Sequence, residues 1–495
     1  MNRWINKLPR ELYVAAGTRE LDRLAIESCG IPGYTLMSRA GQACFELIQE
    51  RYPLARKLLV ICGAGNNGGD GYVLARLAHK AGLEVQLVSL QAGEILSGDA
   101  RLAYDDWKAT GRHSSSWKPA LLQQVDLVVD AMLGTGLTRE VQGQWRDCIE
   151  AVNAWSGPVL AVDVPSGLDS DTGAILGAAI QASHTLSFIG LKQGQLTHQG
   201  RDCCGEIYFA DLGLPAAMRE KVLPMARRLD ATDIKSLLSP RRQSSHKGDY
   251  GHLLIVGGNH GMAGAAALAG RAALRSGAGR VTVMTRPEHI AALVASQPEL
   301  MVQGNDTGKL PHSLLEKADA VVVGPGLGQD EWARSLLSQL LELHSPMLLD
   351  ADALRLISPA DKRDNWILTP HPGEAAALLQ ESTQTIQASR FSSVARLQQM
   401  YGGSVVLKGS GSLVQSAGEL TALCPYGNPG MASAGMGDVL SGIIGALLAQ
   451  GLPRSLAARL GVLVHALAGD DAATAGIRGT LATDLLPALR TWLNP

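Results

Sequence analysis

A glycine-rich segment with two adjacent asparagines, residues 63–71 (GAGNNGGDG), is the first part of the chain whose residue types could do chemistry. It follows an apolar run and precedes a helical pattern, so its backbone N–H groups could approach a phosphate at a helix N-terminus. The side-chain amides of Asn66 and Asn67 add donors and carbonyl oxygens that a bare dinucleotide-binding loop lacks. The alternative is an ordinary tight turn, and five glycines in nine residues make it the weaker interpretation.

Polar side chains follow two further apolar runs in this half of the chain. Asp130 comes directly after residues 125–129, and Asp163 comes after residues 159–162 with Ser166 close behind. If the runs are parallel strands, Asn67, Asp130, Asp163 and Ser166 meet at the sheet edge where ligands of open α/β sheets bind. Oxygen ligands of low total charge suit a hard, monovalent cation. Asp163 is the better candidate for proton transfer, and the alternative for Asp130 is a cap on the following turn.

The second half contains a different pattern, in which the glycine-containing segment 434–437 (AGMG) precedes Asp438 and a strongly apolar helix. Backbone N–H groups at such a helix start form an anion hole for a phosphoryl group. Asp438 is placed to take the proton from a hydroxyl that attacks that phosphoryl group; the alternative is a simple helix cap. Lys408, at the end of another apolar run, either borders a nucleotide or is a surface lysine. A Gly/Ser loop follows it, consisting of Gly409, Ser410, Gly411 and Ser412.

These residues need strands and helices to position them, and the apolar runs predict both. Short apolar runs separated by helix-length segments, such as residues 71–81, indicate βαβ units and parallel sheets. We expect two α/β domains, residues 1–220 and 221–495, because a stretch of mixed charge and prolines lies between the two series. The predicted strands are residues 57–62, 85–90, 125–129 and 159–162 in the first series, and 251–256, 280–284, 320–323, 347–349, 366–368 and 404–407 in the second.

The composition excludes several classes of protein. With 495 residues, 46% of them hydrophobic, the chain is long enough for two or three domains and too apolar to be disordered. A formal charge of -2 gives no electrostatic footprint for nucleic acid or anionic membranes. The longest apolar stretch, residues 439–448, is too short to span a bilayer, and residues 1–17 lack an apolar signal core. We therefore expect a cytoplasmic protein with neither a nucleic-acid nor a membrane partner.

The first half resembles the NAD(P)H-hydrate epimerase domain, through residues 65–71, 130–137 and 163–167. The resemblance implies a Rossmann-like, three-layer parallel sheet that acts on NAD(P)HX, the nicotinamide cofactor hydrated at C6 of its ring. It also implies that Asn67, Asp130 and Ser166 hold a potassium ion and that Asp163 lies against the reacting ring. The residues implied to contact the hydrate are Asn66, Asn67, Gly68, Gly69, Asp70, Gly134, Thr135, Gly136, Leu137, Thr138, Arg139 and Glu140.

The second half resembles the ADP-dependent NAD(P)H-hydrate dehydratase branch of the ribokinase-like superfamily, through residues 246–249, 324–328, 350–354 and 369–374. The resemblance implies a ribokinase-like α/β domain in which Asp438 acts on the hydrate hydroxyl and magnesium bridges the phosphates of ADP. His371 could also be an ordinary loop histidine. The residues implied to contact the hydrate are Ala265, Gly326 and His371, and those implied to contact the adenine nucleotide are Lys408, Gly409, Ser410, Gly411, Ser412 and Gly437.

Both resemblances concern one damaged cofactor, so together they predict a bifunctional repair enzyme. The first domain would interconvert the R and S epimers of NAD(P)HX. The second would phosphorylate the S epimer with ADP and eliminate phosphate, leaving NAD(P)H and AMP. The alternative is an ATP-dependent kinase for a vitamin precursor or sugar, fused to a non-catalytic Rossmann-like binding module. The sequence leaves the oligomeric state open, a homo-oligomer included.

Overall fold

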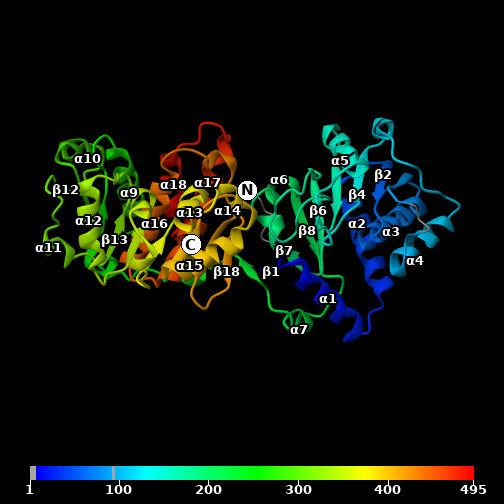
Figure 1. Cartoon of the computed structure of the whole chain (residues 1–495), viewed down its shortest axis with the longest axis horizontal. Helices are drawn as coiled ribbons and strands as arrows, with labels where there is room; N and C mark the ends of the chain where they lie inside the picture. The colour runs from blue at the N-terminus through cyan, green and yellow to red at the C-terminus, as the bar shows by residue number, and fades with distance from the viewer. Residues whose placement is uncertain (1–6, 92–94, 495) are drawn as a thin grey trace. The chain divides into compact units, whose positions relative to one another are not determined.

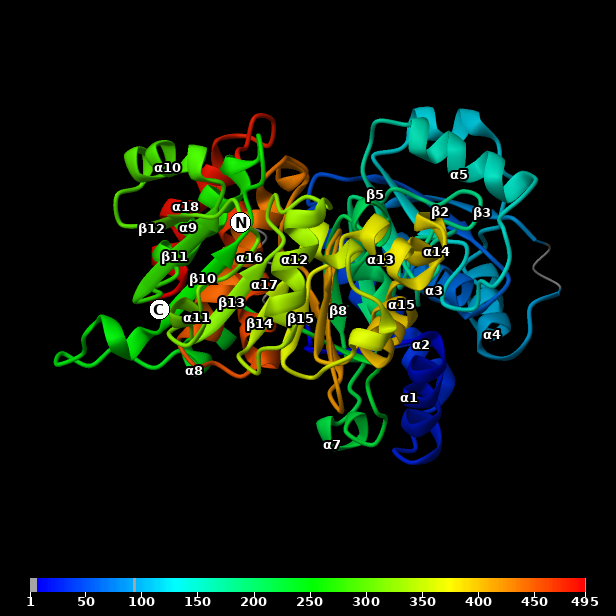
Figure 2. The same cartoon turned by 60° about the vertical axis from the view of Figure 1, so that its left-hand side comes forward.

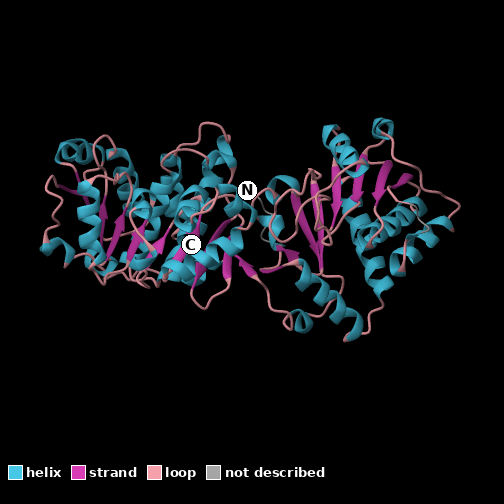
Figure 3. Cartoon of the chain, viewed as in Figure 1, coloured by secondary structure: helices cyan, strands magenta, loops and turns pink. Residues whose placement is uncertain are grey.

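The computed structural model describes residues 7–91 and 95–494. Of residues 1–17, the segment without an apolar signal core, the first six therefore lie outside the described residues. The described residues fall into two compact units, one up to Arg227 and one from Arg228 onward. The boundary between the two units falls within the short strand at residues 226–228. It lies a few residues after the boundary near residue 220 that the composition predicts. Each unit is an α/β structure of its own (Figure 3).

The first unit is built on a parallel sheet with the strand order β3-β2-β4-β5-β6-β8 (Figure 1). A separate short strand, β1, pairs in parallel with β7 and antiparallel with β9. The strands are β1 (Glu11–Tyr13), β2 (Lys57–Cys62), β3 (Glu84–Ser89), β4 (Leu127–Ala131), β5 (Val159–Val162), β6 (His184–Phe188), β7 (Leu191–Lys192), β8 (Glu206–Ala210) and β9 (Ala226–Arg228). The helices are α1 (Ala15–Glu27), α2 (Gly33–Arg51), α3 (Asn66–Lys80), α4 (Gly98–Lys108), α5 (Gln144–Ala154), α6 (Gly200–Cys203) and α7 (Ala216–Arg219).

Side chains of β2 alternate between two hydrophobic cores, one on each face of this sheet. Leu58 and Val60 pack into the core that α2, α3 and α4 cover, whereas Leu59 and Ile61 pack into the core that includes residues of α5. Both sets are fully buried. A strand covered on both faces has to be apolar at every position, because successive side chains point to opposite faces. The predicted three-layer arrangement is confirmed.

The second unit contains a longer sheet, in which β12-β11-β10-β13-β14-β15-β16 are parallel and β17 and β18 continue the order antiparallel. The helices α9, α16 and α17 cover one face, and α12, α13 and α15 cover the other (Figure 2). The strands are β10 (His252–Val256), β11 (Arg280–Thr285), β12 (Met301–Gly304), β13 (Ala320–Val323), β14 (Met347–Leu349), β15 (Trp366–Leu368), β16 (Ser404–Leu407), β17 (Ser412–Ser416) and β18 (Thr421–Cys424). The helices are α8 (Asp233–Leu237), α9 (Ala263–Arg275), α10 (Ile290–Ser296), α11 (His312–Leu315), α12 (Glu331–Leu341), α13 (Pro372–Leu379), α14 (Thr383–Ala388), α15 (Arg390–Tyr401), α16 (Met436–Ala449), α17 (Arg454–Ala472) and α18 (Leu485–Trp492).

Every apolar run that predicts a strand is a strand, with ends that differ by at most two residues. The helix predicted over residues 71–81 begins earlier, at Asn66, so the asparagine-glycine segment forms its first turns. The longest apolar stretch lies inside α16, which is buried along almost its whole length. Within residues 7–91 and 95–494, none of the helices has the length and apolar character needed to cross a bilayer.

Candidate functional sites

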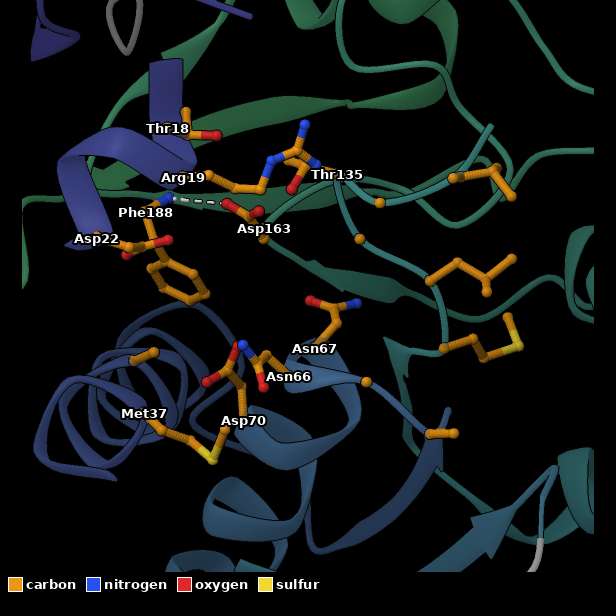
Figure 4. A pocket seen from close by; sticks show the side chains of 18 of the residues that line it. Thr18, Arg19, Asp22, Met37, Asn66, Asn67, Asp70, Thr135, Asp163 and Phe188 are labelled. Carbon is orange, nitrogen blue, oxygen red and sulfur yellow. Dashed lines mark hydrogen bonds between the residues drawn. The ribbon is translucent and has the colours of Figure 1, made fainter. Parts of the chain in front are cut away.

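A cavity of about 810 Å³ opens in the first unit at the carboxyl ends of β2, β4 and β5. This is the edge where an open parallel sheet binds its ligands. Figure 4 shows side chains from α1, α2, α3 and the strand ends around one space. The predicted residues on its wall are Asn66, Asn67, Asp70, Gly134, Thr135, Gly136, Leu137, Thr138, Arg139, Glu140 and Asp163.

Gly68 and Gly69, which are also implied to contact the hydrate, lie in the first turn of α3 between the wall residues Asn67 and Asp70. A Cβ on Gly68 would be 2.1 Å from the carbonyl oxygen of Gly63, and one on Gly69 would be 2.5 Å from Cε of Met37. Both glycines are buried. Their role in this structure is to let the first turns of α3 pack closely against the loop after β2 and against α2.

Asn67, Asp130 and Ser166, the predicted cation ligands, are buried near one another. Ser166 donates to Asp130 from its Oγ at 2.5 Å and from its backbone N at 2.7 Å, and Leu133 N donates to Ser166 Oγ at 2.8 Å. Burial raises the pKa of Asp130 to about 6, although the hydrogen bonds from Ser166 lower it. Asn67 lies against Gly134, because a Cβ added to Gly134 would be 3.3 Å from Cβ of Asn67. Neither Oδ1 nor Nδ2 of Asn67 has a partner among the described residues.

Asp163, the predicted proton-transfer residue, is held in an unusual conformation directly after β5. Its φ of +64° is in the left-handed region, which costs free energy for a residue other than glycine. Its Oδ1 accepts hydrogen bonds from Phe188 N at 3.0 Å and from Lys192 Nζ. Lys192 is 1% exposed and also donates to Phe188 O at 2.9 Å. The surroundings therefore fix the direction of one carboxyl group of the cavity and pair it with a buried ammonium.

Two more carboxyls face the same cavity, Asp22 from α1 and Asp70 from α3. Burial raises the pKa of Asp22 to about 6, with Lys192 lowering it and Asp163 raising it. Burial also raises the pKa of Asp70 well above its usual range, and the charges of Asp163 and Asp22 add to that shift. The sequence interpretation assigned no role to Asp22 or Lys192. The only signal for Lys192 is a lysine inside an otherwise apolar stretch that ends in β7.

The second unit has its own cluster of charged groups around the start of α16. Gly435, in the left-handed region at φ +87°, is the N-cap of this helix. A Cβ on Gly437 would lie 3.4 Å from Lys408 Nζ and 3.5 Å from Asp350 Oδ2. Lys408 Nζ donates to Asp350 Oδ1 at 2.7 Å. The structure thus brings the predicted helix start and the predicted lysine together.

Asp438 follows Gly437 in the first turn of this helix, and its carboxyl group has a raised pKa. Burial raises its pKa to about 7, and the nearby charge of Asp350 raises it while that of Lys408 lowers it. Burial lowers the pKa of Lys408, but the carboxylates of Asp350 and Glu374 outweigh it and leave a net rise. A general base with a pKa near 7 suits catalysis at neutral pH. Sequence reasoning missed Asp350 and Glu374 as members of the site, although both lie in segments that carry the family resemblance.

Arg390, at the start of α15, holds the Gly/Ser loop that follows Lys408. Its guanidinium is buried and donates to the carbonyl oxygens of Leu407 at 3.4 Å, Lys408 at 3.4 Å and Gly411 at 3.2 Å. Burial lowers the pKa of Arg390 to about 10, which leaves it charged at neutral pH. One buried cation therefore binds carbonyls on both sides of the turn at Gly409 and fixes the conformation of the loop.

Replacing Gly409 by alanine should weaken the binding of ADP. Gly409 has a φ of +134°, and a Cβ there would lie 2.9 Å from Arg390 Nη1. The substitution would strain the backbone by roughly 1–3 kcal/mol and displace the guanidinium. We expect the KM for ADP to rise about tenfold or more. The matched control is Gly418→Ala, which also has a positive φ but nothing within 4 Å of the added Cβ. An unchanged KM for ADP in Gly409→Ala would contradict this role of the loop.

The residues predicted to contact the hydrate in this unit lie in the first turn of α9, on the loop after β13 and at the N-cap of α13. A Cβ on Gly326 would be 3.2 Å from Cβ of Ala265, so these two residues are neighbours. His371 is the N-cap of α13, and its Nδ1 accepts from Gly373 N at 3.0 Å and Glu374 N at 3.3 Å. Glu374 also lies 3.8 Å from Lys408 Nζ. The histidine is thus a helix cap with a half-exposed ring, connected through Glu374 to the cluster at α16.

The fold and the two sites define a two-domain α/β protein, with a Rossmann-like parallel sheet followed by a ribokinase-like domain. The family described as YjeF-related protein N-terminus matches residues 33–194, and the NAD(P)H-hydrate dehydratase family matches residues 253–490. The bifunctional NAD(P)H-hydrate repair enzyme Nnr of Escherichia coli is 46% identical over 490 residues, which is 99% of this chain and 95% of the relative. This chain therefore belongs to the family of bifunctional NAD(P)H-hydrate repair enzymes.

Solved structures resemble the second unit. A ribokinase-like superfamily protein from Enterococcus faecalis is 31% identical, with a TM-score of 0.51, over 54% of this chain and 96% of its own. An ADP/ATP-dependent NAD(P)H-hydrate dehydratase from Bacillus subtilis, co-crystallized with ATP and Mg²⁺, is 28% identical, with a TM-score of 0.48, over 53% of this chain and 96% of its own. The first of these confirms the ribokinase-like fold. The family membership disfavours the alternative of a kinase fused to a non-catalytic module.

Proposed function

We propose that the first unit interconverts the R and S epimers of NAD(P)HX in its cavity. The observation that carries this proposal is the cavity wall, where Asn66, Asp70 and the loop 134–140 surround the fixed carboxylate of Asp163. The nicotinamide ring enters beside Asp163, and Asp163 exchanges a proton with the C6 hydroxyl. Opening and reclosing the ring at C6 then gives the other epimer.

Within the same proposal, the second unit dehydrates the S epimer with ADP. The N–H groups at the start of α16 and Lys408 bind the phosphates, and the Gly/Ser loop 409–412 borders the nucleotide together with Gly437. Asp438 takes the proton of the C6 hydroxyl as it attacks the terminal phosphoryl group, and loss of phosphate then regenerates NAD(P)H and leaves AMP. Its intermediate position between buried and exposed, and its pKa near 7, support this role. ADP enters as its magnesium complex.

The proposal is tested by incubating the full chain with separately purified R and S hydrates of NADH, with and without ADP. We expect the epimers to interconvert without nucleotide. We expect the absorbance of the dihydronicotinamide to appear, with AMP and phosphate, only when ADP is added. Chromatography of the epimers and of the nucleotides follows both steps. A stable phosphorylated product in place of free phosphate would show a kinase, and no change in the epimer ratio would show that the first unit only binds.

We also propose that Asn67, Asp130 and Ser166 hold a potassium ion. The donors fit it, because buried oxygens of low total charge suit a monovalent hard cation and because both polar atoms of the Asn67 amide are buried without a partner. The ion would supply a fixed positive charge beside the loop at Leu133 and Gly134.

Removing potassium should lower the melting temperature of the protein. A ligand that binds only the folded state stabilises it, so Tm in potassium chloride should exceed Tm in tetramethylammonium chloride of equal ionic strength. Asn67→Ala should abolish this difference. Asn153→Ala, which changes an asparagine far from the cavity wall, should keep it. An equal rise of Tm in Asn67→Ala would contradict the assignment of Asn67 as a ligand.

A further inference from the structure

Epimerisation through ring opening needs two proton-transfer groups in opposite ionisation states. A base takes the proton of the C6 hydroxyl, the C6–N1 bond breaks, and the oxygen becomes the carbonyl of an aldehyde. The electron pair of the broken bond goes to N1, which takes a proton from an acid. Rotation about C5–C6 exposes the other face of the aldehyde, and the same two transfers in reverse close the ring. Neither group gains or loses a proton over the cycle.

The cavity of the first unit contains groups that meet both requirements. Figure 4 shows the carboxyls of Asp22, Asp70 and Asp163 around one space beside the ring of Phe188. The buried ammonium of Lys192 is hydrogen-bonded to Asp163 and to neither of the other two. Three carboxyls around one buried cation cannot all ionise without a large cost, because like charges at close range in a dry site repel. Asp163 is the one that forms the ion pair with Lys192.

Asp70 is the group best placed to keep its proton. It lies on α3 only a few residues after Asn66 and Asn67, on the same cavity wall. No hydrogen-bond donor within residues 7–91 or 95–494 stabilises its ionised form. Burial raises its pKa well above the usual range, whereas burial raises that of Asp22 only to about 6. Asp22 therefore carries charge at neutral pH and adds to the repulsion that keeps Asp70 protonated.

We propose that Asp70 is the acid that protonates N1 and that Asp163 is the base that takes the hydroxyl proton. This inference rests on the proposed epimerase function and adds the second catalytic group. The charge of Asp22 raises the pKa of Asp70, and that of Lys192 lowers it. The titratable and charged groups around Asp70 are Arg19 and Asp22 on α1, Cys44 on α2, Cys62 on β2, Asp99 on α4, Arg139 and Glu140 on the loop after β4, Asp163 after β5, and Lys192 on β7.

The test compares Asp70→Asn, Asp70→Glu and Asp22→Asn in the full chain. Asp70→Asn should reduce kcat for epimerisation about 10²- to 10⁴-fold with little change in KM, because it removes the acid but keeps a polar side chain of the same size. Asp70→Glu should recover part of that loss. Asp22→Asn should move the alkaline limb of the pH profile of epimerisation to lower pH, since it removes a negative charge that holds the proton on Asp70. Asp147→Asn, on the exposed side of α5, is the matched control and should change neither rate nor profile.

Two readouts separate this inference from the proposed function and from a folding defect. ADP-dependent dehydration of the S epimer by the same variants reports whether the second unit is intact, and the melting temperature of each variant reports whether the first unit, which contains Asp70, is folded. Wild-type protein that fails to interconvert the epimers would overturn the proposed function itself. Active wild type together with an Asp70→Asn variant within threefold of its rate would overturn only the role of Asp70. An alkaline limb unmoved in Asp22→Asn would contradict the coupling that keeps Asp70 protonated.

Discussion

Asp438→Asn should abolish ADP-dependent dehydration, with a fall in kcat of roughly 10³-fold, while epimerisation continues at the wild-type rate. The variant keeps the helix start of α16 and the groups that hold the phosphates, so ADP should still bind. It removes the carboxylate that accepts the hydroxyl proton. Stopped assays for AMP and phosphate measure the first activity, and separation of the epimers measures the second.

The pH dependence of dehydration in the wild type follows from the same carboxyl. Burial raises the pKa of Asp438 to about 7, so its basic form dominates only above neutral pH. We expect the rate to rise with pH and to be about one tenth of its plateau at about one pH unit below that pKa. Besides burial, the charges that set this limb are those of Asp350, which raises the pKa of Asp438, and Lys408, which lowers it. Glu374 acts on Lys408, and the charge of Lys408 also lowers the pKa of the buried His465.

The stability of the Asp438→Asn variant shows whether a loss of activity comes from the missing base or from a folding defect. A carboxyl whose folded-state pKa is raised holds its proton more tightly in the folded state, so stability falls as pH rises from about 4 through 7. Asparagine lacks that penalty, so the variant should be as stable as wild type at about pH 4 and more stable than wild type at pH 8. Loss of both activities in a variant with unchanged Tm would contradict the division of labour between the two units. Dehydration above one tenth of the wild-type rate would contradict the role of Asp438 as base.

Much of the fold can be predicted from the sequence, because parallel strands buried on both faces leave a signal. The run 57–62 is apolar at nearly every position for that reason, and so are the runs that form β10 and β13. The strand β6 gives no such signal. Its Thr185 and Ser187 are fully buried, and both hydroxyls have hydrogen-bond partners. The hydroxyl of Thr185 donates to Cys204 O, and that of Ser187 accepts from Lys192 Nζ. Hydropathy along the chain cannot distinguish such satisfied polar residues from residues of a loop.

The two sites likewise contain some residues that could be predicted from the sequence and others that could not. Residues that follow an apolar run, such as Asp163 and Lys408, could be predicted because the carboxyl ends of parallel strands meet at one edge. Asp22 and Lys192 are far from Asp163 in the sequence, and only the packing of α1 and β7 brings them to it. The close contacts of Gly68 and Gly69 could not be predicted, because a sequence does not show whether a glycine serves an approaching ligand, a close contact between helix and loop, or both.

Asp163→Asn should reduce epimerisation about 10³-fold while ADP-dependent dehydration of the S epimer continues. Asparagine tolerates the left-handed conformation of this position better than most residues, so the backbone after β5 should be retained. The carboxylate that exchanges a proton with the hydrate is lost. A mixture of R and S hydrates should then be consumed only as far as its S fraction when ADP is present, whereas wild type should consume both.

Asp163→Asn also removes the ionised partner of a buried cation, and this makes a second variant necessary. Lys192 is 1% exposed, and leaving its charge without a carboxylate partner should destabilise the first unit, by up to about 3 kcal/mol because Asp22 and Asp70 compensate in part. The double variant Asp163→Asn with Lys192→Met removes the unpaired charge, so it should recover stability but not epimerisation. If the double variant regained the activity, the loss in the single variant would be one of folding, and Asp163 would be a structural partner of Lys192 alone.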